Sequence, residues 1–242
     1  MINMSCHIET GKREKNDDRI SINKTLISQG SHTESADRTC LVVVCDGVGG
    51  ESFGNEAAET ATALFSEKSD QELTKTEIEN HIITVNNAII HAQKKTPQHA
   101  KMATTIAGLY INNNDFITFN IGDSRIYRYR SPYIMQISTD HSLRQQQIDM
   151  GDEPTPGSES TITRYLGGNN AKPSITEGKG RILSNDIFVL CSDGVWGSLE
   201  NEDFEQILTT DESLETKCQT LVSQALQNGS TDNLSVIIVE VT

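Results

Sequence analysis

Four short acidic motifs, widely separated in the chain, limit its fold more than any other feature. Each lies beside a run of hydrophobic residues with the pattern of a β-strand. They are Asn16-Asp17-Asp18, Asp46-Gly47, Ser192-Asp193-Gly194 and Thr231-Asp232-Asn233. Carboxylates that a fold gathers at strand ends repel one another unless a cation lies between them. The motifs therefore predict a divalent-metal site assembled from distant parts of the chain.

The residues around Asp46 show why this arrangement suits a metal ion. Residues 41–45 form a continuous apolar run rich in valine, which is typical of a strand buried on both faces. The carboxylate of Asp46 is then expected at the end of that strand. Gly47 has no side chain, so its carbonyl oxygen can approach an ion closely. Hard cations such as Mg²⁺ and Mn²⁺ prefer oxygen ligands of this kind.

The other three motifs repeat this arrangement. Asp193 follows a predicted strand, Asp232 precedes the final predicted strand at residues 234–241, and Asp18 precedes a short one. Any one of these motifs alone is more often an ordinary solvated turn. Their combination, each motif beside a strand, favours a metal site with oxygen ligands only.

The charge and the cysteines of the chain limit its partners and its location. The 242 residues carry a net charge of −14, whereas a nucleic-acid or anionic-membrane surface needs clustered Lys and Arg. The five cysteines include no CxxC pair, so neither a disulfide framework nor a zinc site is indicated. The sequence has no signal peptide and no apolar stretch that approaches the roughly 20 residues of a membrane helix. We expect a cytoplasmic protein that binds no nucleic acid and does not insert into a membrane.

The hydrophobic patterns predict sheets covered by helices. Helices are expected at residues 56–68, 76–94, 200–209 and 212–227. Residues 106–137 are predicted to form an antiparallel meander of four short strands, because turn residues separate four apolar runs. The polar segment 24–39 is expected to be a loop, and a further strand is expected at 178–183. Strands and helices occur in groups, which argues against alternating βαβ units.

Further short motifs accompany the acidic ones. The segments are Arg13-Glu14-Lys15-Asn16-Asp17-Asp18, Val44-Cys45-Asp46-Gly47-Val48-Gly49-Gly50, Met102-Ala103-Thr104-Thr105, Gly122-Asp123-Ser124-Arg125, Asp140-His141-Ser142, Ile162-Thr163-Arg164-Tyr165-Leu166-Gly167, Ser192-Asp193-Gly194-Val195-Trp196 and Gly229-Ser230-Thr231-Asp232-Asn233. In this order and spacing they resemble the metal-dependent protein serine/threonine phosphatases of the PP2C (PPM) family, in their compact bacterial form. The resemblance implies an α+β fold, in which a central sandwich of two antiparallel β-sheets is flanked by α-helices. It also implies a single phosphatase domain over residues 1–242, with the metal centre in a cleft at one end.

The resemblance assigns a role to each acidic motif. Asp46 would bridge two Mn²⁺ or Mg²⁺ ions, with the carbonyl group of Gly47 as a further ligand. Asp193 and Asp232 would complete the first metal site. Asp18 would hold the second ion, partly through water. Two ions held in this way activate a bridging water or hydroxide for attack on phosphorus and neutralise charge on the phosphoryl group.

Three residues beside these ligands are expected to support the reaction. Arg13 corresponds to the phosphate-binding arginine of the family, and a guanidinium fork suits two phosphate oxygens. Without the motif around it, Arg13 would be interpreted as a solvated surface charge. Asn16 and Asn233 are expected to support the site, Asn233 by positioning the loop of Asp232 rather than by binding metal.

Asp123 has two interpretations. It corresponds to the position that, together with Asp193, holds a third, weaker metal ion in bacterial relatives. It is equally consistent with a turn residue paired with Arg125, and the sequence does not separate the two.

The general acid is left open by the sequence. Eukaryotic members have a histidine directly after the Asp-Gly pair, proposed as the acid for the leaving alkoxide, whereas this chain has Val48. Bacterial members commonly carry an apolar residue there, so the difference does not argue against activity. His141 is the only histidine inside a motif, and we expect it to be structural.

Residues 143–165 correspond to the variable flap of bacterial members. Their proline and glycine content and the family analogy predict a segment that gates the cleft and influences substrate choice. An ordinary surface loop is the alternative.

The function predicted from the resemblance is hydrolysis of phosphoserine and phosphothreonine in proteins, opposing a bacterial Ser/Thr kinase. The expected cofactors are two Mn²⁺ or Mg²⁺ ions and a third, weaker one, and the expected oligomeric state is a monomer. One alternative is a catalytically inactive member that acts as a binding module, which the presence of all four carboxylates disfavours. Another is a phosphatase of small phosphorylated molecules, since fold analogy does not settle the substrate.

Overall fold

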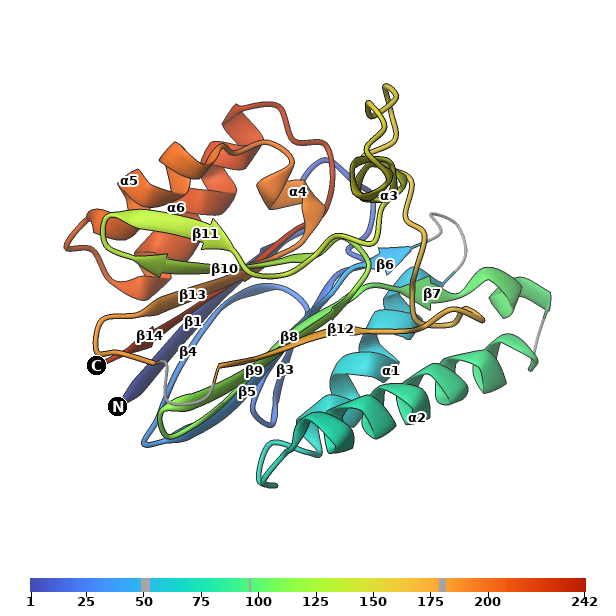
Figure 1. Ribbon diagram of the computed structural model, residues 1–242, viewed down its shortest axis with the longest axis horizontal. Coiled ribbons are helices and arrows are strands. Elements are labelled where there is room, and N and C mark those ends of the chain that lie inside the picture. The colour runs from blue at the N-terminus through green and yellow to red at the C-terminus, as the bar shows by residue number, and fades with distance from the viewer. Residues whose placement is uncertain (49–52, 96, 179–181) are drawn as a thin grey trace.

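Two six-stranded antiparallel sheets pack face to face at the centre of the protein, with helices on both outer faces (Figure 1). The computed structural model describes residues 1–48, 53–95, 97–178 and 182–242. The first sheet has the strand order β11-β10-β13-β14-β1-β4, and the second has the order β12-β9-β8-β5-β2-β3. This is the α+β sandwich that the sequence predicts.

The elements have the following bounds. The first sheet consists of β1 (Ile2–Glu9), β4 (Gly30–Ala36), β10 (Arg125–Arg130), β11 (Tyr133–Gln136), β13 (Ile187–Cys191) and β14 (Leu234–Val241). The second consists of β2 (Arg19–Ile22), β3 (Thr25–Ile27), β5 (Thr39–Cys45), β8 (Ile106–Asn112), β9 (Asp115–Ile121) and β12 (Ser174–Gly178). A small separate ladder joins β6 (Gly47–Val48) and β7 (Ala103–Thr104). The helices are α1 (Gly54–Ser66), α2 (Lys75–Gln93), α3 (Leu143–Met150), α4 (Asp193–Trp196), α5 (Asn201–Thr209) and α6 (Leu214–Gln227), with a 3₁₀ turn at Pro97–Lys101.

Strand β5 shows how the layers are packed. Every second residue of the strand lies in the core between the two sheets, namely Cys40, Val42 and Val44. The residues between them pack in the core beneath α1 and α2, namely Leu41, Val43 and Cys45. Because successive strand residues point to opposite faces, an unbroken apolar run fills both cores at once, as the sequence predicts. A third core joins the first sheet to α5 and α6.

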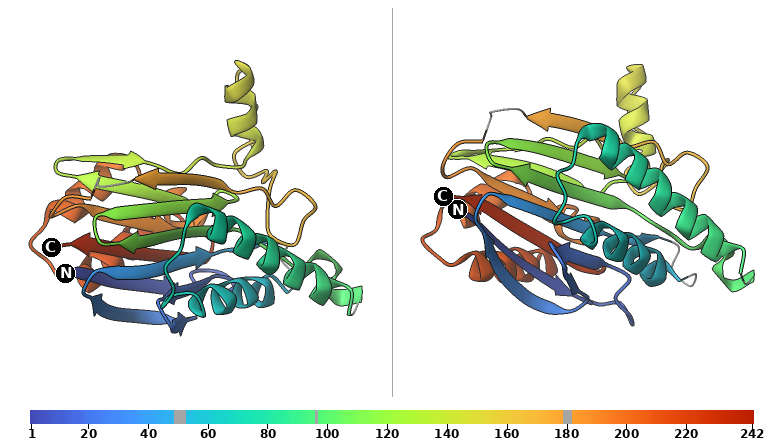
Figure 2. Two further views of the ribbon diagram at one scale, coloured as in Figure 1. Left: turned by 60° about the horizontal axis from the view of Figure 1, so that its bottom comes forward. Right: turned by 90° about the horizontal axis from the view of Figure 1, so that it is seen from below.

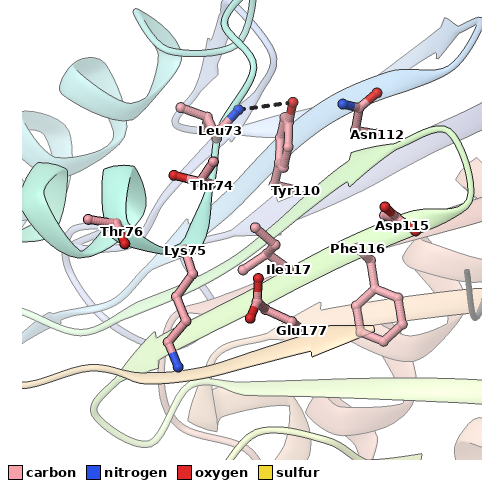
Figure 3. Close-up of a pocket in the computed structure, with 10 residues that line it drawn as sticks. All are labelled: Leu73, Thr74, Lys75, Thr76, Tyr110, Asn112, Asp115, Phe116, Ile117 and Glu177. Atoms are coloured by element: carbon pink, nitrogen blue, oxygen red, sulfur yellow. Dashed lines mark hydrogen bonds between the residues drawn. The ribbon is translucent and has the colours of Figure 1, made fainter. Parts of the chain in front are cut away.

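A capping box and a hydrogen bond to a tyrosine hydroxyl fix the start of α2. Thr74 Oγ1 accepts from the backbone N–H of Glu77 at 3.3 Å, and Glu77 Oε2 accepts from the backbone N–H of Thr74 at 2.6 Å. The hydroxyl of Tyr110 on β8 accepts from the backbone N–H of Leu73 at 3.2 Å (Figure 3). These contacts anchor α2 to the second sheet, beside a cavity of about 440 Å³ that the residues drawn in Figure 3 line.

Two expectations for the strands are wrong, and a third falls largely outside the described residues. Residues 24–39 are not a loop, because β3 and β4 lie there and β4 pairs along almost all of β1. Residues 106–137 are not one meander, because β9 pairs with β8 in the second sheet whereas β10 pairs with β11 and β13 in the first. The chain crosses between the sheets at Gly122, which has a φ of 103°. Strand β12 ends at Gly178, where the predicted strand 178–183 begins, and residues 179–181 lie outside the described residues.

The segment 143–165 contains the only α-helix, among the described residues, that has no buried residue. None of the residues of α3 is buried, and the helix projects from the body of the sandwich in both views of Figure 2. Its base is held by the paired residues Ser142 and Ile162 and by a hydrogen bond from the Thr163 N–H to the His141 carbonyl at 2.7 Å. Across the described ranges, helices are either too short or too polar to cross a membrane.

Candidate metal centre

The four acidic motifs lie at one end of the sandwich. The first residue of β2 pairs with the last residue of β5, so Asp18 and Asp46 are neighbours across the second sheet. In the first sheet the end of β13 pairs with the start of β14, which brings Asp193 and Asp232 together. Antiparallel register thus gathers carboxylates that are separated by as many as 214 positions in the chain (Asp18 to Asp232), at the end where β6 and α4 lie in Figure 1.

Asp18 is buried between the two sheets, with 1% of its surface exposed. Its Oδ2 accepts hydrogen bonds from Ser192 Oγ at 2.8 Å and from Ser235 Oγ at 2.6 Å. Asn16 shapes the turn that leads to it, because Asn16 Oδ1 accepts from the backbone N–H of Asp18 at 3.0 Å. Asn16 thus holds the backbone of Asp18, and its support of a metal centre stays a prediction.

The backbone of Asp46 is fixed by two threonines. Its N–H donates to Thr105 Oγ1 at 3.0 Å, and its carbonyl accepts from the Thr105 N–H and from Thr104 Oγ1, both at 2.8 Å. The next residue, Gly47, touches the backbone of Gly54 at the start of α1 so closely that any Cβ would overlap it. Glycine at position 47 is thus required by packing, in addition to any role of its carbonyl group.

Asp193 begins α4, and its carboxylate has one oxygen without a partner. Asp193 Oδ1 is buried and makes no hydrogen bond within the described part of the chain. Asp232 is more exposed, and its Oδ2 forms an ion pair of 2.7 Å with Arg13 Nη2. The structure thus places Arg13 at the site, where its partner is a candidate metal ligand.

Asn233 ties two loops of the site together. Its Oδ1 accepts from the backbone N–H of Asp17 at 2.8 Å, and its Nδ2 donates to the carbonyl oxygens of Thr10 and Lys15, both at 2.9 Å. All of the side chain's polar atoms are therefore committed to the loop that carries Arg13. Positioning rather than metal binding fits this geometry.

Asp123 does not pair with Arg125. Its Oδ1 is buried without a hydrogen-bond partner among the described residues. Arg125 instead forms a bidentate pair with Asp140, with Nη2 at 2.8 Å and Nε at 3.0 Å from Oδ2, and its guanidinium lies 3.4 Å from the ring centroid of Trp196. The turn interpretation, in which Asp123 pairs with Arg125, is therefore not supported, and the charge of Asp193 acts on the carboxylate of Asp123.

The gathered carboxylates raise one another's pKa values. The pKa of Asp18 and the pKa of Asp123 are each raised to about 7, mainly by burial and to a smaller extent by the charge of Asp193. Burial, followed by the charges of the other four aspartates, raises the pKa of Asp46 well above its ordinary value. Burial and the charge of Asp232 raise the pKa of Asp193, although its hydrogen bond with Asp46 lowers it. The site therefore holds more negative charge than its own hydrogen bonds compensate.

The residues present fit a hard divalent cation. Two buried carboxylate oxygens, Asp193 Oδ1 and Asp123 Oδ1, lack the hydrogen-bond partners that buried polar atoms normally have. All donors are carboxylate or carbonyl oxygens, as Mg²⁺ and Mn²⁺ prefer. Across the described ranges, no three His, Cys, Asp or Glu side chains are already arranged around one point as ligands. We nevertheless favour the metal interpretation, because side-chain rotations bring neighbouring carboxylates together at little cost once a cation compensates their repulsion.

The raised pKa values predict an unusual pH dependence for the metal-free protein. Unfolded aspartate has a pKa of about 3.9, so the folded state binds more protons between about pH 4 and pH 7, and stability falls as the pH rises through this range. Buried His141, with its pKa lowered to about 4, opposes the trend because only the unfolded state takes up its proton. From about pH 6 to about pH 8 we expect a net loss on the order of 2 kcal/mol in the free energy of unfolding.

Urea unfolding in EDTA at both pH values measures this loss. Asp123→Asn, which removes one raised pKa, should show a smaller loss than wild type. Saturating Mn²⁺ should reverse the trend, because metal ions bind the deprotonated carboxylates. Metal-free stability that rises over the same interval would contradict the prediction.

His141 has the structural role that the sequence suggests. Its Nδ1 accepts from the backbone N–H of Gly122 at 3.2 Å, so its Nε2 carries the proton and donates to Ser174 Oγ at 2.9 Å. Burial lowers its pKa to about 4, so the ring is neutral near pH 7. His141 thus joins the crossover at Gly122 to β12 and is not placed as an acid for a leaving group.

No role for Ser192 or Ser235 follows from the sequence analysis, although both side chains contact a candidate ligand. Ser235 carries the one hydroxyl in the otherwise apolar residues 234–239. A polar residue at a core-facing position of a strand signals a buried hydrogen-bond partner, but the sequence alone does not say which partner.

Comparison with known proteins places the chain in a family. The model of the family described as protein phosphatase 2C matches residues 12–229. The protein phosphatase PhpP of Streptococcus pneumoniae is 31% identical over 220 residues, which cover 86% of this chain and 88% of the relative. The solved structure of the S. agalactiae serine/threonine phosphatase is similar to this structure with a TM-score of 0.86 at 26% identity. The solved structure of the PstP catalytic domain in complex with 2 manganese ions has a TM-score of 0.82 at 26% identity. Each comparison covers 100% of this chain and 100% of the other chain. The chain therefore belongs to the protein phosphatase 2C family.

Proposed function

We propose that this protein is a metal-dependent protein serine/threonine phosphatase, which hydrolyses phosphoserine and phosphothreonine in phosphoprotein substrates. The observation that carries the proposal is the convergence of aspartates at one end of the sandwich, with two buried oxygens that lack partners. Family membership and the phosphatase names of the relatives support the same reaction.

The proposed ligands follow the geometry of the site. Asp46, with the carbonyl group of Gly47, lies between the other carboxylates and would be shared by two ions. Asp193 and Asp232 would complete one of these sites, and Asp18 the other. When bound, the ions would supply a water activated for attack on phosphorus and would offset charge on the phosphoryl group. The ion pair between Arg13 and Asp232 keeps the guanidinium beside the ligands, where its remaining N–H groups would bind phosphate oxygens.

A third ion would bind between Asp123 and Asp193. The unpartnered oxygen on each residue supports this assignment. We also propose that the protein acts as a monomer in the cytoplasm, and that its substrates are phosphorylated by a cognate Ser/Thr kinase. For the proton of the leaving group, neither Val48 nor the buried, hydrogen-bonded His141 offers a suitable donor.

Hydrolysis of a phosphothreonine peptide and of p-nitrophenyl phosphate by EDTA-treated protein tests the proposal. We expect the peptide to be hydrolysed only after Mn²⁺ or Mg²⁺ is restored. Turnover of the aryl phosphate without the peptide would favour a small-molecule phosphatase. Manganese binding without turnover of either compound would favour the inactive binding module.

A further inference from the structure

The carboxylate of Asp18 joins the two sheets at the floor of the site. Asp18 directly precedes β2 in the second sheet, whereas Ser192 follows β13 and Ser235 lies in β14 of the first sheet. Both serine hydroxyls meet Asp18 Oδ2, at 2.8 and 2.6 Å. All three residues are fully or almost fully buried, with exposed fractions of 1%, 0% and 0%. We call this set the Ser–Asp–Ser bridge.

The direction of the Ser192 hydroxyl is fixed by the strand beside it. Ser192 Oγ accepts from the backbone N–H of Ser235 at 3.1 Å, and the Ser192 N–H donates to the carbonyl of Ser235 at 3.0 Å. With its oxygen occupied by that amide, Ser192 points its own proton at Asp18. The donor is therefore oriented before any ion binds.

The two hydroxyls meet one carboxylate oxygen only. Hydrogen bonds from hydroxyls to an ionised carboxylate are short and strong, typically about 2.5–2.7 Å, and two on the same atom fix both the position and the rotation of the group. Neither hydroxyl bonds to the second oxygen, Oδ1, and the carboxylate of Asp18 interacts with the charges of Asp46 and Asp193. Ser192 also directly precedes Asp193, so one backbone segment positions two candidate ligands.

We propose that Ser192 and Ser235 are positioning residues of the metal centre, which hold Asp18 Oδ2 so that Oδ1 is presented to a divalent ion. This inference rests on the proposed function, because it assigns a task to the metal site described above. The competing explanation is that the bridge only joins the two sheets. The explanations differ in whether losing a hydroxyl changes metal affinity or only stability.

Calorimetric titration with Mn²⁺ of EDTA-treated wild type, Ser235→Ala and Ser192→Ala distinguishes the two explanations. Partners that orient metal ligands typically contribute about 10–100-fold in metal affinity, so we expect one Mn²⁺ dissociation constant to rise at least about tenfold in each variant. Ser5→Ala is the matched control. Ser5 is equally buried in the first sheet, but its hydroxyl bonds to Thr33 Oγ1 and the His32 carbonyl, so its loss should leave Mn²⁺ affinity unchanged.

Ser235→Thr keeps the hydroxyl and tests packing separately. We expect it to bind Mn²⁺ within about threefold of wild type, because the hydrogen bond to Asp18 is retained. An affinity loss as large as in Ser235→Ala would assign the effect to packing and overturn the proposal. Equal affinity in wild type and both alanine variants, with only a lower melting temperature, would also overturn it.

A second readout is the Mn²⁺ concentration that gives half-maximal hydrolysis. Metal is present throughout this assay, so it can be used even if an alanine variant unfolds in EDTA. This concentration should rise at least about tenfold in the alanine variants, while kcat at saturating Mn²⁺ stays within about threefold of the wild-type value, because the ligand is displaced but not removed. An unchanged half-maximal concentration would contradict the inference. Wild type that binds no Mn²⁺ would instead refute the proposed function, so the two failures are distinguishable.

Discussion

Asp193→Asn is expected to reduce metal-dependent hydrolysis of a phosphothreonine peptide by at least about a thousandfold. Divalent ions contribute several kcal/mol to charge stabilisation in reactions of this kind, and each 1.4 kcal/mol corresponds to a factor of ten in rate. The charge of Asp193 acts on most of the neighbouring aspartates, since it raises the pKa values of Asp18, Asp46 and Asp123. An amide in its place is a weaker ligand without charge.

The same substitution should raise the melting temperature of the metal-free protein. Removing one charge from a set of mutually repelling, buried carboxylates relieves repulsion that no cation offsets in EDTA. Loss of activity together with a gain in metal-free stability separates a damaged ligand from a damaged fold. Asp211→Asn, at an exposed position between α5 and α6, is the control and should change neither quantity. A variant with a lower melting temperature in EDTA would show that Asp193 has mainly a structural role.

Arg13→Ala is expected to lower kcat/KM for the peptide by about 10–100-fold, because hydrogen bonds to charged groups contribute about 1.5–3 kcal/mol. Arg13 is half exposed, and within the described part of the chain its ion pair with Asp232 is the only salt bridge that either residue forms. A solvent-exposed pair of this kind contributes little to stability, so the folded state should be almost unaffected. The loss should therefore lie in the reaction.

Two comparisons make the test of Arg13 specific. Arg13→Lys keeps the charge but not the planar fork, so it should restore only part of the rate. Lys12→Ala removes an exposed neighbouring charge and should leave kcat/KM unchanged. Rates of Arg13→Ala within about twofold of wild type would contradict phosphate binding by this residue.

The parts of the fold that follow from local patterns could be predicted. The valine-rich run of β5 and the amphipathic helices α1 and α2 are each specified by residues close together in the chain. Strand β4 could not be predicted in this way. Its seven residues are mostly polar and lie at the edge of the first sheet, so it is held by the backbone ladder to β1 rather than by an apolar face of its own.

The crossing from β9 to β10 illustrates a second limit. Gly122 and Asp123 have the composition of a hairpin turn, and only pairing of β10 with the distant β13 decides that the chain changes sheets. The candidate ligands were predictable because their motifs are contiguous. The roles of Ser192 and Ser235 were not, because they depend on the register between strands from different parts of the chain.

The strand order of the first sheet has a consequence for biosynthesis. Strand β1 precedes β14 by most of the chain, yet it lies between β4 and β14 in the sheet. Because a chain leaves the ribosome with its N-terminal side first, β1 cannot complete its pairing until β14 has been made. Asp232 lies just before β14, so a nascent chain lacks this candidate ligand for the same period. The protein is therefore expected to become active only after β14 has left the ribosome.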